Sequence, residues 1–460
     1  MLSANKMTSL ERRAIAGLSS IMSLRMIGLF MVLPVFSLYA HQLKGSTPTL
    51  VGLAMGIYGL SQALFQIPFG ALSDRYGRKP VIVAGLLIFS IGSLVAGFAH
   101  SIFFMILGRA LQGIGAVGST IMALLADLTR ENQRTKAMAV TGMTIGFSFS
   151  TAMLLGPLLT RWLPVSSLFF LAVLFGLAGI FVLFTSVPAP LNTHWHRDTE
   201  PELHSFFKLL VAPELAKLNC GIFILHAIFT ASFVALPVSL KQFAGLESSR
   251  QWEIYLPALL GAFIVSLVCI GMAERKQQVK PYFIGGITTL ALAELLIWLT
   301  PYSLALAVTG ICLFFTGFSL LEAFLPSLIS RAAPAARKGS ALGIYSCAQF
   351  LGIFTGGVLG GWLFGHFGFS GVYFFCTALA LFWLLPAFFM QPPRYLVTQM
   401  WRIYPPMQPH WDTIAAKLQG IPGMVETTYI AEDSTAYLKM ERKTLQHPDF
   451  IRLKEQLQSE

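Results

Sequence analysis

Twelve apolar stretches, each about twenty residues long or longer, dominate this sequence of 460 residues. A helix of about 20 apolar residues crosses the ~30 Å hydrocarbon layer of a bilayer. The stretches are continuous and do not alternate with polar residues, which favours helices over barrel strands. Only 12% of the residues are charged, about half the share found in soluble domains. The sequence therefore predicts an integral membrane protein that spans the membrane at residues 14–40, 48–72, 79–99, 102–126, 136–160, 166–187, 217–241, 252–272, 281–299, 303–330, 339–364 and 369–390.

The basic residues predict how these helices are oriented. The six segments on one predicted side carry three lysines or arginines each, and the other side carries only Lys44, Arg161, Lys241 and Arg250. Lysine and arginine accumulate in cytoplasmic loops, so both termini are expected in the cytoplasm, in a bacterial-type inner (plasma) membrane. The net charge of +11 is spread over these loops, so no nucleic-acid partner is expected.

One charged stretch, Gly70–Pro80, separates the second and third apolar runs. We expect Gly70 to end the preceding helix and Gly77 to supply a turn that a residue with a Cβ would resist. Asp74 lies close in sequence to three cations: Arg75, Arg78 and Lys79. The stretch reads G-x-L-x-D-R-x-G-R-K. It resembles the motif between helices 2 and 3 of the major facilitator superfamily, and every diagnostic position is filled.

The resemblance covers about residues 10–390 and implies a transporter with alternating access. It also implies that Asp74 faces the start of the eleventh span, near Gly339, in a latch that favours the outward-open state. Asp127, which closes the fourth span, is expected to pair with Arg78 or Arg75. These residues form the candidate conformational switch: Gly70, Asp74, Arg75, Gly77, Arg78, Lys79 and Asp127.

The membrane part repeats at an offset of about 200 residues, with Lys79-Pro80 matching Lys280-Pro281. Internal repeats are typical of transporters. The expected fold is an all-α membrane protein of two six-helix pseudo-repeats, residues 1–187 and 217–390, joined by a cytoplasmic linker at 188–216.

The last part, 394–460, is expected to be a soluble cytoplasmic α+β module. Its predicted order is strand (about 398–404), helix (409–419), strand (423–430), strand (434–440) and helix (447–458), a ferredoxin-like βαββα. It looks like heavy-metal-associated domains but lacks C-x-x-C, so no metal is expected. Regulation, self-association or a tail without a role in transport are the alternatives. With Arg25–Gly28, Leu128–Arg130 and Leu325–Ser330, this tail is similar to the YajR-type branch of the superfamily, regarded as proton-driven efflux transporters.

Ionisable residues within the spans are few, and each is costly unless it has a partner or faces water. They are Arg25, Arg109, His226, Glu294 and Glu322. Glu322, in an apolar setting, is the first proton-carrier candidate. Glu294 is close enough to a predicted span end to reach water, and His226 is more readily a core histidine. Arg25 either binds an anionic group or balances one of the acids.

Arg109 begins R-x-x-x-G-x-G, which resembles the superfamily's fourth-span motif. The resemblance links this arginine to proton transfer, because a fixed cation lowers the pKa of a nearby acid. The alternative is an arginine permanently bonded to helix carbonyls.

Glycines in two other spans are candidates for close helix packing. The fifth span keeps Gly156-Pro157, the core of the antiporter motif G-x-x-x-G-P-x-x-G-G, but loses its first and last glycines. The eleventh span carries Gly352, Gly356 and Gly360 without a proline. The departure weakens, but does not remove, the assignment to drug antiporters.

Our first functional hypothesis is a proton-coupled efflux antiporter for small amphiphilic compounds or drugs. The alternatives are a proton-coupled importer of a sugar or organic acid, and a membrane sensor that signals through the C-terminal module. No G-x-x-x-x-G-K-[ST] loop predicts nucleotide binding, and no residue cluster predicts an enzyme. The five cysteines lie in apolar runs without a C-x-x-C pair, so we expect no disulfide framework, metal or cofactor.

Overall fold

The first half of the membrane bundle contains six spans, two of which are interrupted. The computed structural model describes residues 7–188, 209–299, 303–334, 337–391, 396–402, 411–430 and 435–459, so most of the predicted linker lies outside the described residues. The helices of this half are α1 (Ser9–Phe30), α2 (Leu33–Ala40), α3 (Pro48–Tyr76), α4 (Arg78–Gly97), α5 (Ile102–Ile114), α6 (Gly118–Asp127), α7 (Glu131–Leu159) and α8 (Ser166–Thr185). The first span breaks between α1 and α2, just before Pro34, and the fourth breaks between α5 and α6.

The second half is α10 (Pro213–Ala244), the short 3-10 helix η1 (Ser248–Arg250), α11 (Trp252–Lys276), α12 (Val279–Leu299), α13 (Leu304–Ala332) and α14 (Lys338–Phe388). α14 has 51 residues, about 77 Å at ~1.5 Å per residue, more than twice the hydrocarbon thickness. It is two helices that meet at Gly368, whose φ of 63° and ψ of −155° are not helical.

The last span therefore returns to the end where α14 begins. The ammonium of Lys280, at the start of α12, donates to the carbonyl of Phe388 at 2.7 Å. Eleven helical segments of the described residues are long and apolar enough to cross a membrane, with α1–α2 and α5–α6 each counted as one. Because α14 supplies two spans, the described chain agrees with the prediction of twelve.

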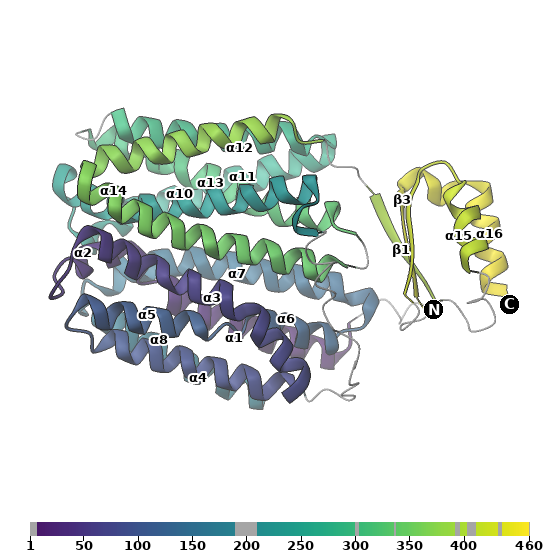
Figure 1. Cartoon of the computed structure of the whole chain (residues 1–460), viewed down its shortest axis with the longest axis horizontal. Helices are drawn as coiled ribbons and strands as arrows, with labels where there is room; N and C mark the ends of the chain where they lie inside the picture. The colour runs from purple at the N-terminus through teal and green to yellow at the C-terminus, as the bar shows by residue number, and fades with distance from the viewer. Residues whose placement is uncertain are drawn as a thin grey trace.

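We call the end of the bundle that holds the Gly77 turn, the end of α13 and the start of α14 the basic end, and the other the opposite end. Figure 1 shows the helices side by side, with the C-terminal module beyond the basic end.

The two halves touch closely at the opposite end. There α3 and α14 cross so tightly that a Cβ on Gly357 would lie 2.9 Å from the backbone of Gly56. The hydroxyl of Ser37, in α2, donates to the carbonyl of Val234, in α10, at 2.6 Å. Nearer the basic end, a Cβ on Gly339 or Gly343 would have none of the described atoms within 4 Å. These close contacts between the halves thus lie at the opposite end, and Gly339 and Gly343 take part in none among the described residues.

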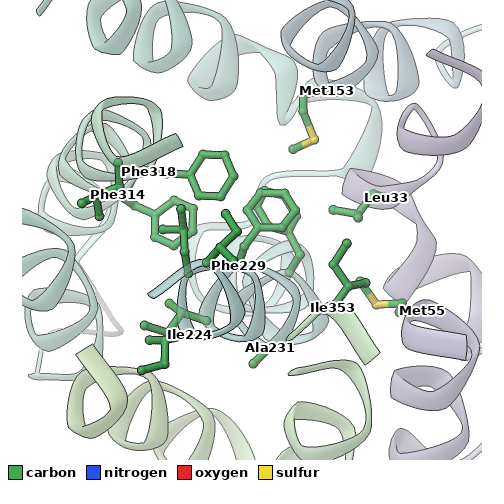
Figure 2. Packing of buried hydrophobic residues seen from close by; sticks show 14 of the residues in the cluster. Leu33, Met55, Met153, Ile224, Phe229, Ala231, Phe314, Phe318 and Ile353 are labelled. Atoms are coloured by element: carbon green, nitrogen blue, oxygen red, sulfur yellow. The ribbon is translucent and has the colours of Figure 1, made fainter. Parts of the chain in front are cut away.

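An apolar layer fills the middle of the bundle between the halves. Figure 2 shows side chains of α2, α3 and α7 meeting those of α10, α13 and α14. The labelled residues of this layer are Leu33, Met55, Met153, Ile224, Phe229, Ala231, Phe314, Phe318 and Ile353.

The C-terminal module has the βαββα order expected from the sequence. It consists of β1 (Leu396–Arg402), α15 (Trp411–Gln419), β2 (Met424–Ile430), β3 (Thr435–Glu441), the short 3-10 helix η4 (Arg442–Gln446) and α16 (Pro448–Ser459). The sheet is antiparallel with the order β1-β3-β2. Its core includes Leu418, Leu438, Met440 and Phe450, each at most 1% exposed.

The crossing of α3 and α14 makes a prediction about stability. We expect Gly357→Ala to lower the thermal stability of the purified protein in detergent, because overpacking a close contact costs about 1–3 kcal/mol. Gly261→Ala on α11 is the matched control, because a Cβ there meets no described atom within 4 Å. Equal melting temperatures for the two variants, measured by thermal aggregation, would contradict the assigned contact.

Candidate functional site

The carboxyl group of Glu322 lies on α13 and faces α10 and α14. The amide of Gln349 donates to Glu322 Oε1 at 3.4 Å, and His226 Nε2 lies 3.8 Å from Oε2. The same histidine nitrogen is 2.9 Å from Gln349 Nε2. We call Glu322, His226 and Gln349 the Glu322 cluster.

The Glu322 cluster joins a buried imidazole to an acid whose side chain is partly exposed. The side chain of Glu322 is 37% exposed, whereas that of His226 is 8% exposed. The Nδ1 atom of His226 contacts the carbonyl of Ile222 at 3.3 Å. The Oε2 atom of Glu322 is itself buried and has no hydrogen-bond partner among the described residues, and it lies within reach of a second titratable group. His226 is buried and hydrogen-bonded, as expected of a core histidine, and it also lies near Glu322.

The interior of the first half carries two buried arginines. Arg25, fully buried on α1, donates from Nη2 to the amide oxygen of Gln62 at 3.0 Å. Arg109, 3% exposed on α5, donates to Gln112 Oε1 at 2.8 Å. Neither arginine forms an ion pair with an acidic side chain in the described part of the chain. The Nε and Nη1 atoms of Arg25 have no hydrogen-bond partner among the described residues.

Aromatic rings connect the arginines of the first half to the Glu322 cluster. The guanidinium of Arg109 lies 4.5 Å from the ring centroid of Tyr58, which contacts Phe30 at 6.3 Å. Phe30 packs on Phe149 at 5.2 Å. Phe149 then stacks on Phe318 of the second half at 5.8 Å, and Phe318 contacts the His226 ring at 5.7 Å. Apolar surface thus separates the basic interior of one half from the acidic group of the other.

Glu294 lies elsewhere and does not reach water. It is fully buried on α12, and the hydroxyl of Ser232 donates to its Oε1 at 2.5 Å. The expectation that Glu294 could simply reach solvent from near a span end is wrong. α12 packs against its neighbours at this turn and buries the Glu294 side chain. The number of residues between Glu294 and the helix end therefore did not predict its exposure to water.

The Gly70–Pro80 stretch forms an ion-pair network within the first half. Arg78 contacts Asp74 and also donates from Nε to Asp127 Oδ2 at 3.0 Å. Lys79 donates to the carbonyl of Val187 at 2.7 Å, and Arg75 lies over the exposed ring of Tyr76.

Two glycines of this stretch differ from each other in the structure. Gly77 has a φ of +91°, a conformation that residues with a Cβ rarely adopt. Gly70 does not end a helix, because α3 continues to Tyr76. A Cβ on Gly70 would meet only Ser119, at an ordinary 3.7 Å. The charged and polar residues after Gly70 can continue the helix, because they lie at the end where side chains leave the bilayer.

The remaining candidate glycines lie at helix contacts. Gly352, Gly356 and Gly360 of α14 pack against the backbone of α10. Gly156 faces the carbonyl of Met31, at the break between α1 and α2, and Pro157 follows it inside α7. The alternate face of α14, with Gly357 and Gly361, packs on α3.

A groove of about 600 Å³ lies between α1 and α7 toward the basic end. Hydroxyl groups of Ser19, Ser20, Ser23 and Thr144 line it, and Arg12 and Lys136 also contribute to its wall. Met7, Ile15, Leu24 and Val140 also line it, so most of the exposed lining is apolar.

Several residues of the site escaped the sequence reasoning. Gln62, Gln112 and Gln349 contact the ionisable groups inside the bundle. Amides within apolar spans were the signal that could have found them. Glu11 was also missed: it accepts from Arg130 Nε at 2.9 Å and thereby joins the starts of α1 and α7.

Comparison with known proteins gives the same architecture. The model of the Major Facilitator Superfamily matches residues 18–354 and 258–400. The inner membrane transport protein YajR of Escherichia coli strain K12 is 43% identical over 438 residues, which cover 95% of this chain and 96% of that protein.

More distant relatives share most of the chain. Multidrug resistance protein MdtH of Klebsiella pneumoniae strain 342 is 26% identical over 346 residues, covering 74% of this chain and 83% of its own. Among solved structures, the human organic anion transporter MFSD10 (TETRAN) is similar in fold, with a TM-score of 0.61 at 18% identity, over 84% of this chain and all of that one.

The twelve-span bundle, its small C-terminal module and these matches agree with one another. They identify a transporter of small molecules in the inner membrane and not an enzyme. The chain belongs to the major facilitator superfamily.

Proposed function

We propose that this protein is a proton-coupled secondary transporter working by alternating access, and that it exports small amphiphilic compounds in exchange for protons. The observation that carries the proposal is the Glu322 cluster, a carboxyl on a partly exposed side chain inside the bundle, without a cationic lysine or arginine partner among the described residues, beside an aromatic layer between the halves. The aromatic layer suits the apolar body of an amphiphile, and Glu322 binds the proton. The relationship to a multidrug resistance protein favours export.

Alternating access uses the asymmetry between the two ends of the bundle. We propose that the basic end faces the cytoplasm, as the distribution of lysine and arginine predicts, so the described arrangement is inward-open. A rocking of the halves would open the crossing of α3 and α14 at the opposite end and close the basic end. Compound and proton would then occupy the middle of the bundle alternately.

The buried arginines favour one alternative substrate. Arg25 and Arg109 have no acidic partner among the described residues, and a carboxylate would supply one. This favours proton-coupled uptake of an organic acid as the second candidate function. The direction of proton movement separates the two candidates.

The first prediction concerns Glu322. In proteoliposomes with an internal pH dye, an added exported compound should move inward down its gradient and drive protons out, so the interior becomes alkaline. Uptake by symport would make the interior acidic. We expect Glu322→Gln to reduce the compound-driven proton flux to that of protein-free liposomes, because the glutamine amide does not bind a proton near neutral pH.

Glu253→Gln is the matched control for Glu322→Gln. Glu253 is an acid of the same half, at the opposite end, paired with Arg250 at 3.0 Å, and its loss should leave the flux unchanged. A proton flux that persists in Glu322→Gln at the wild-type rate would exclude Glu322 as the carrier.

The second prediction concerns Asp74. In the described arrangement Asp74 pairs with Arg78 in its own half. A Cβ on Gly339 would have no described atom within 4 Å, so the space beside Gly339 is empty of described residues. The latch to the start of α14 therefore belongs to the state in which the basic end is closed. An anion at a helix N-terminus contributes about 1 kcal/mol, so we expect Asp74→Asn to reduce transport roughly fivefold.

Asp127→Asn serves as the comparison for Asp74→Asn. It also removes an anion from Arg78, but it leaves the latch intact, and we expect the smaller loss of transport. The measurement is the same proton flux, normalised to protein content. A larger loss in Asp127→Asn than in Asp74→Asn would contradict the latch.

A further inference from the structure

One contact of the C-terminal module with the bundle is made by a buried lysine. Lys439, on the central strand β3, is 7% exposed. Its ammonium donates to the carbonyl of Arg331 at 2.6 Å and to the carbonyl of Ala333 at 3.0 Å. Arg331 lies in the last turn of α13 and Ala333 is its C-cap. At this end of a helix the last carbonyls lack intrahelical partners and the helix dipole attracts a cation.

The sheet face that carries Lys439 is the face turned toward the bundle. Leu438 and Met440, its neighbours in β3, point into the module's own core, and alternate residues of a strand point to opposite faces. Figure 1 shows the sheet between the bundle and the helices α15 and α16. One face of the sheet is covered by these helices, and the other docks on the basic end.

The docking position is a corner of the second half that has a counterpart in the first. Arg331, at the end of α13, pairs with Glu274, at the end of α11, at 2.5 Å. In the first half, Asp127 at the end of α6 pairs with Arg78 after α3. In the first half the acid lies at the end of α6, whereas in the second half the base lies at the corresponding end of α13. Only the corner of the second half is seen to be bound by Lys439 in the described structure.

This corner leads directly into the segment that must move when the basic end closes. α13 ends at Ala332, with Ala333 as its C-cap, and α14 begins at Lys338, next to the Gly339 position that the family resemblance assigns to the latch with Asp74. Burial lowers the pKa of Lys439, Glu426 across the sheet opposes this shift, and nearby Lys338 adds to it. The ammonium thus gives up solvation to bind the end of α13.

We propose that the C-terminal module is an intramolecular clamp: docked through Lys439 on the end of α13, it holds the end of α13 and the start of α14 in the arrangement of the open basic end. Release of the module favours closure. By linkage, anything that binds the free sheet face of the module would also shift the transporter toward the closed basic end.

The test measures two distances by pulsed electron paramagnetic resonance in the full-length protein. The spin labels are attached to encoded keto amino acids, which leaves the native cysteines in place. Labels at Asp412 and Lys276, both exposed, report docking of the module on the second half. Labels at Tyr76 and Ser340, also exposed, report the opening of the basic end.

We expect Lys439→Met to broaden the docking distribution and to raise the closed-to-open ratio about tenfold, because a hydrogen-bonded charge is lost. If the Lys439→Met variant does not express, Lys439→Gln takes its place in the experiment. Lys439→Arg should keep both distributions. Lys417→Met is the control for the loss of one positive charge, since Lys417 is an exposed residue of α15, in the layer beyond the sheet.

Each remaining outcome overturns the clamp. An unchanged docking distribution in Lys439→Met would show that this lysine does not hold the module. A broadened docking distribution with an unchanged basic end would show docking without control of the conformation. The measurement needs neither substrate nor proton gradient, so its result is independent of whether the protein is an antiporter.

Discussion

The close approach of α3 and α14 is the contact on which the rest of the bundle depends. Without side chains at Gly52, Gly56, Gly357 and Gly361, two backbones from different halves can lie against each other. Lipid offers no hydrophobic force to bring helices together, so packing of this kind stabilises helix pairs in membranes. The crossing fixes which end of the bundle is closed, and thereby which polar groups inside are reachable from the basic end.

Charge inside the bundle is divided between the halves. The buried arginines lie in the first half, and Glu294 and Glu322 lie in the second, with phenylalanine rings between Arg109 and Glu322. Permanent contact between the two sets would neutralise both and remove the reason for either to bind a substrate or a proton. The aromatic layer keeps them apart while it offers the apolar surface that an amphiphilic compound requires.

Much of the fold was predictable from the sequence, because the bilayer imposes a length and an apolar composition on every span. The twelve spans, the Gly77 turn and the βαββα module followed from continuous apolar runs, a charged motif and turn residues. The depth of Glu294 and the continuation of α3 beyond Gly70 did not follow, because both depend on how neighbouring helices pack. The contact between His226 and Glu322 joins residues almost a hundred positions apart. Lys439 binds two backbone carbonyls at the end of α13, and backbone carbonyls carry no signal in the sequence.

The turn at Gly368 has a mechanical consequence for the last two spans. A single non-helical residue joins them, so little free chain is left to absorb a change of angle between them. The last two spans should therefore tilt together as one stiff helical hairpin. The module follows the end of this hairpin by only a few residues and is also fastened to α13. Its position would therefore report the tilt of the whole second half.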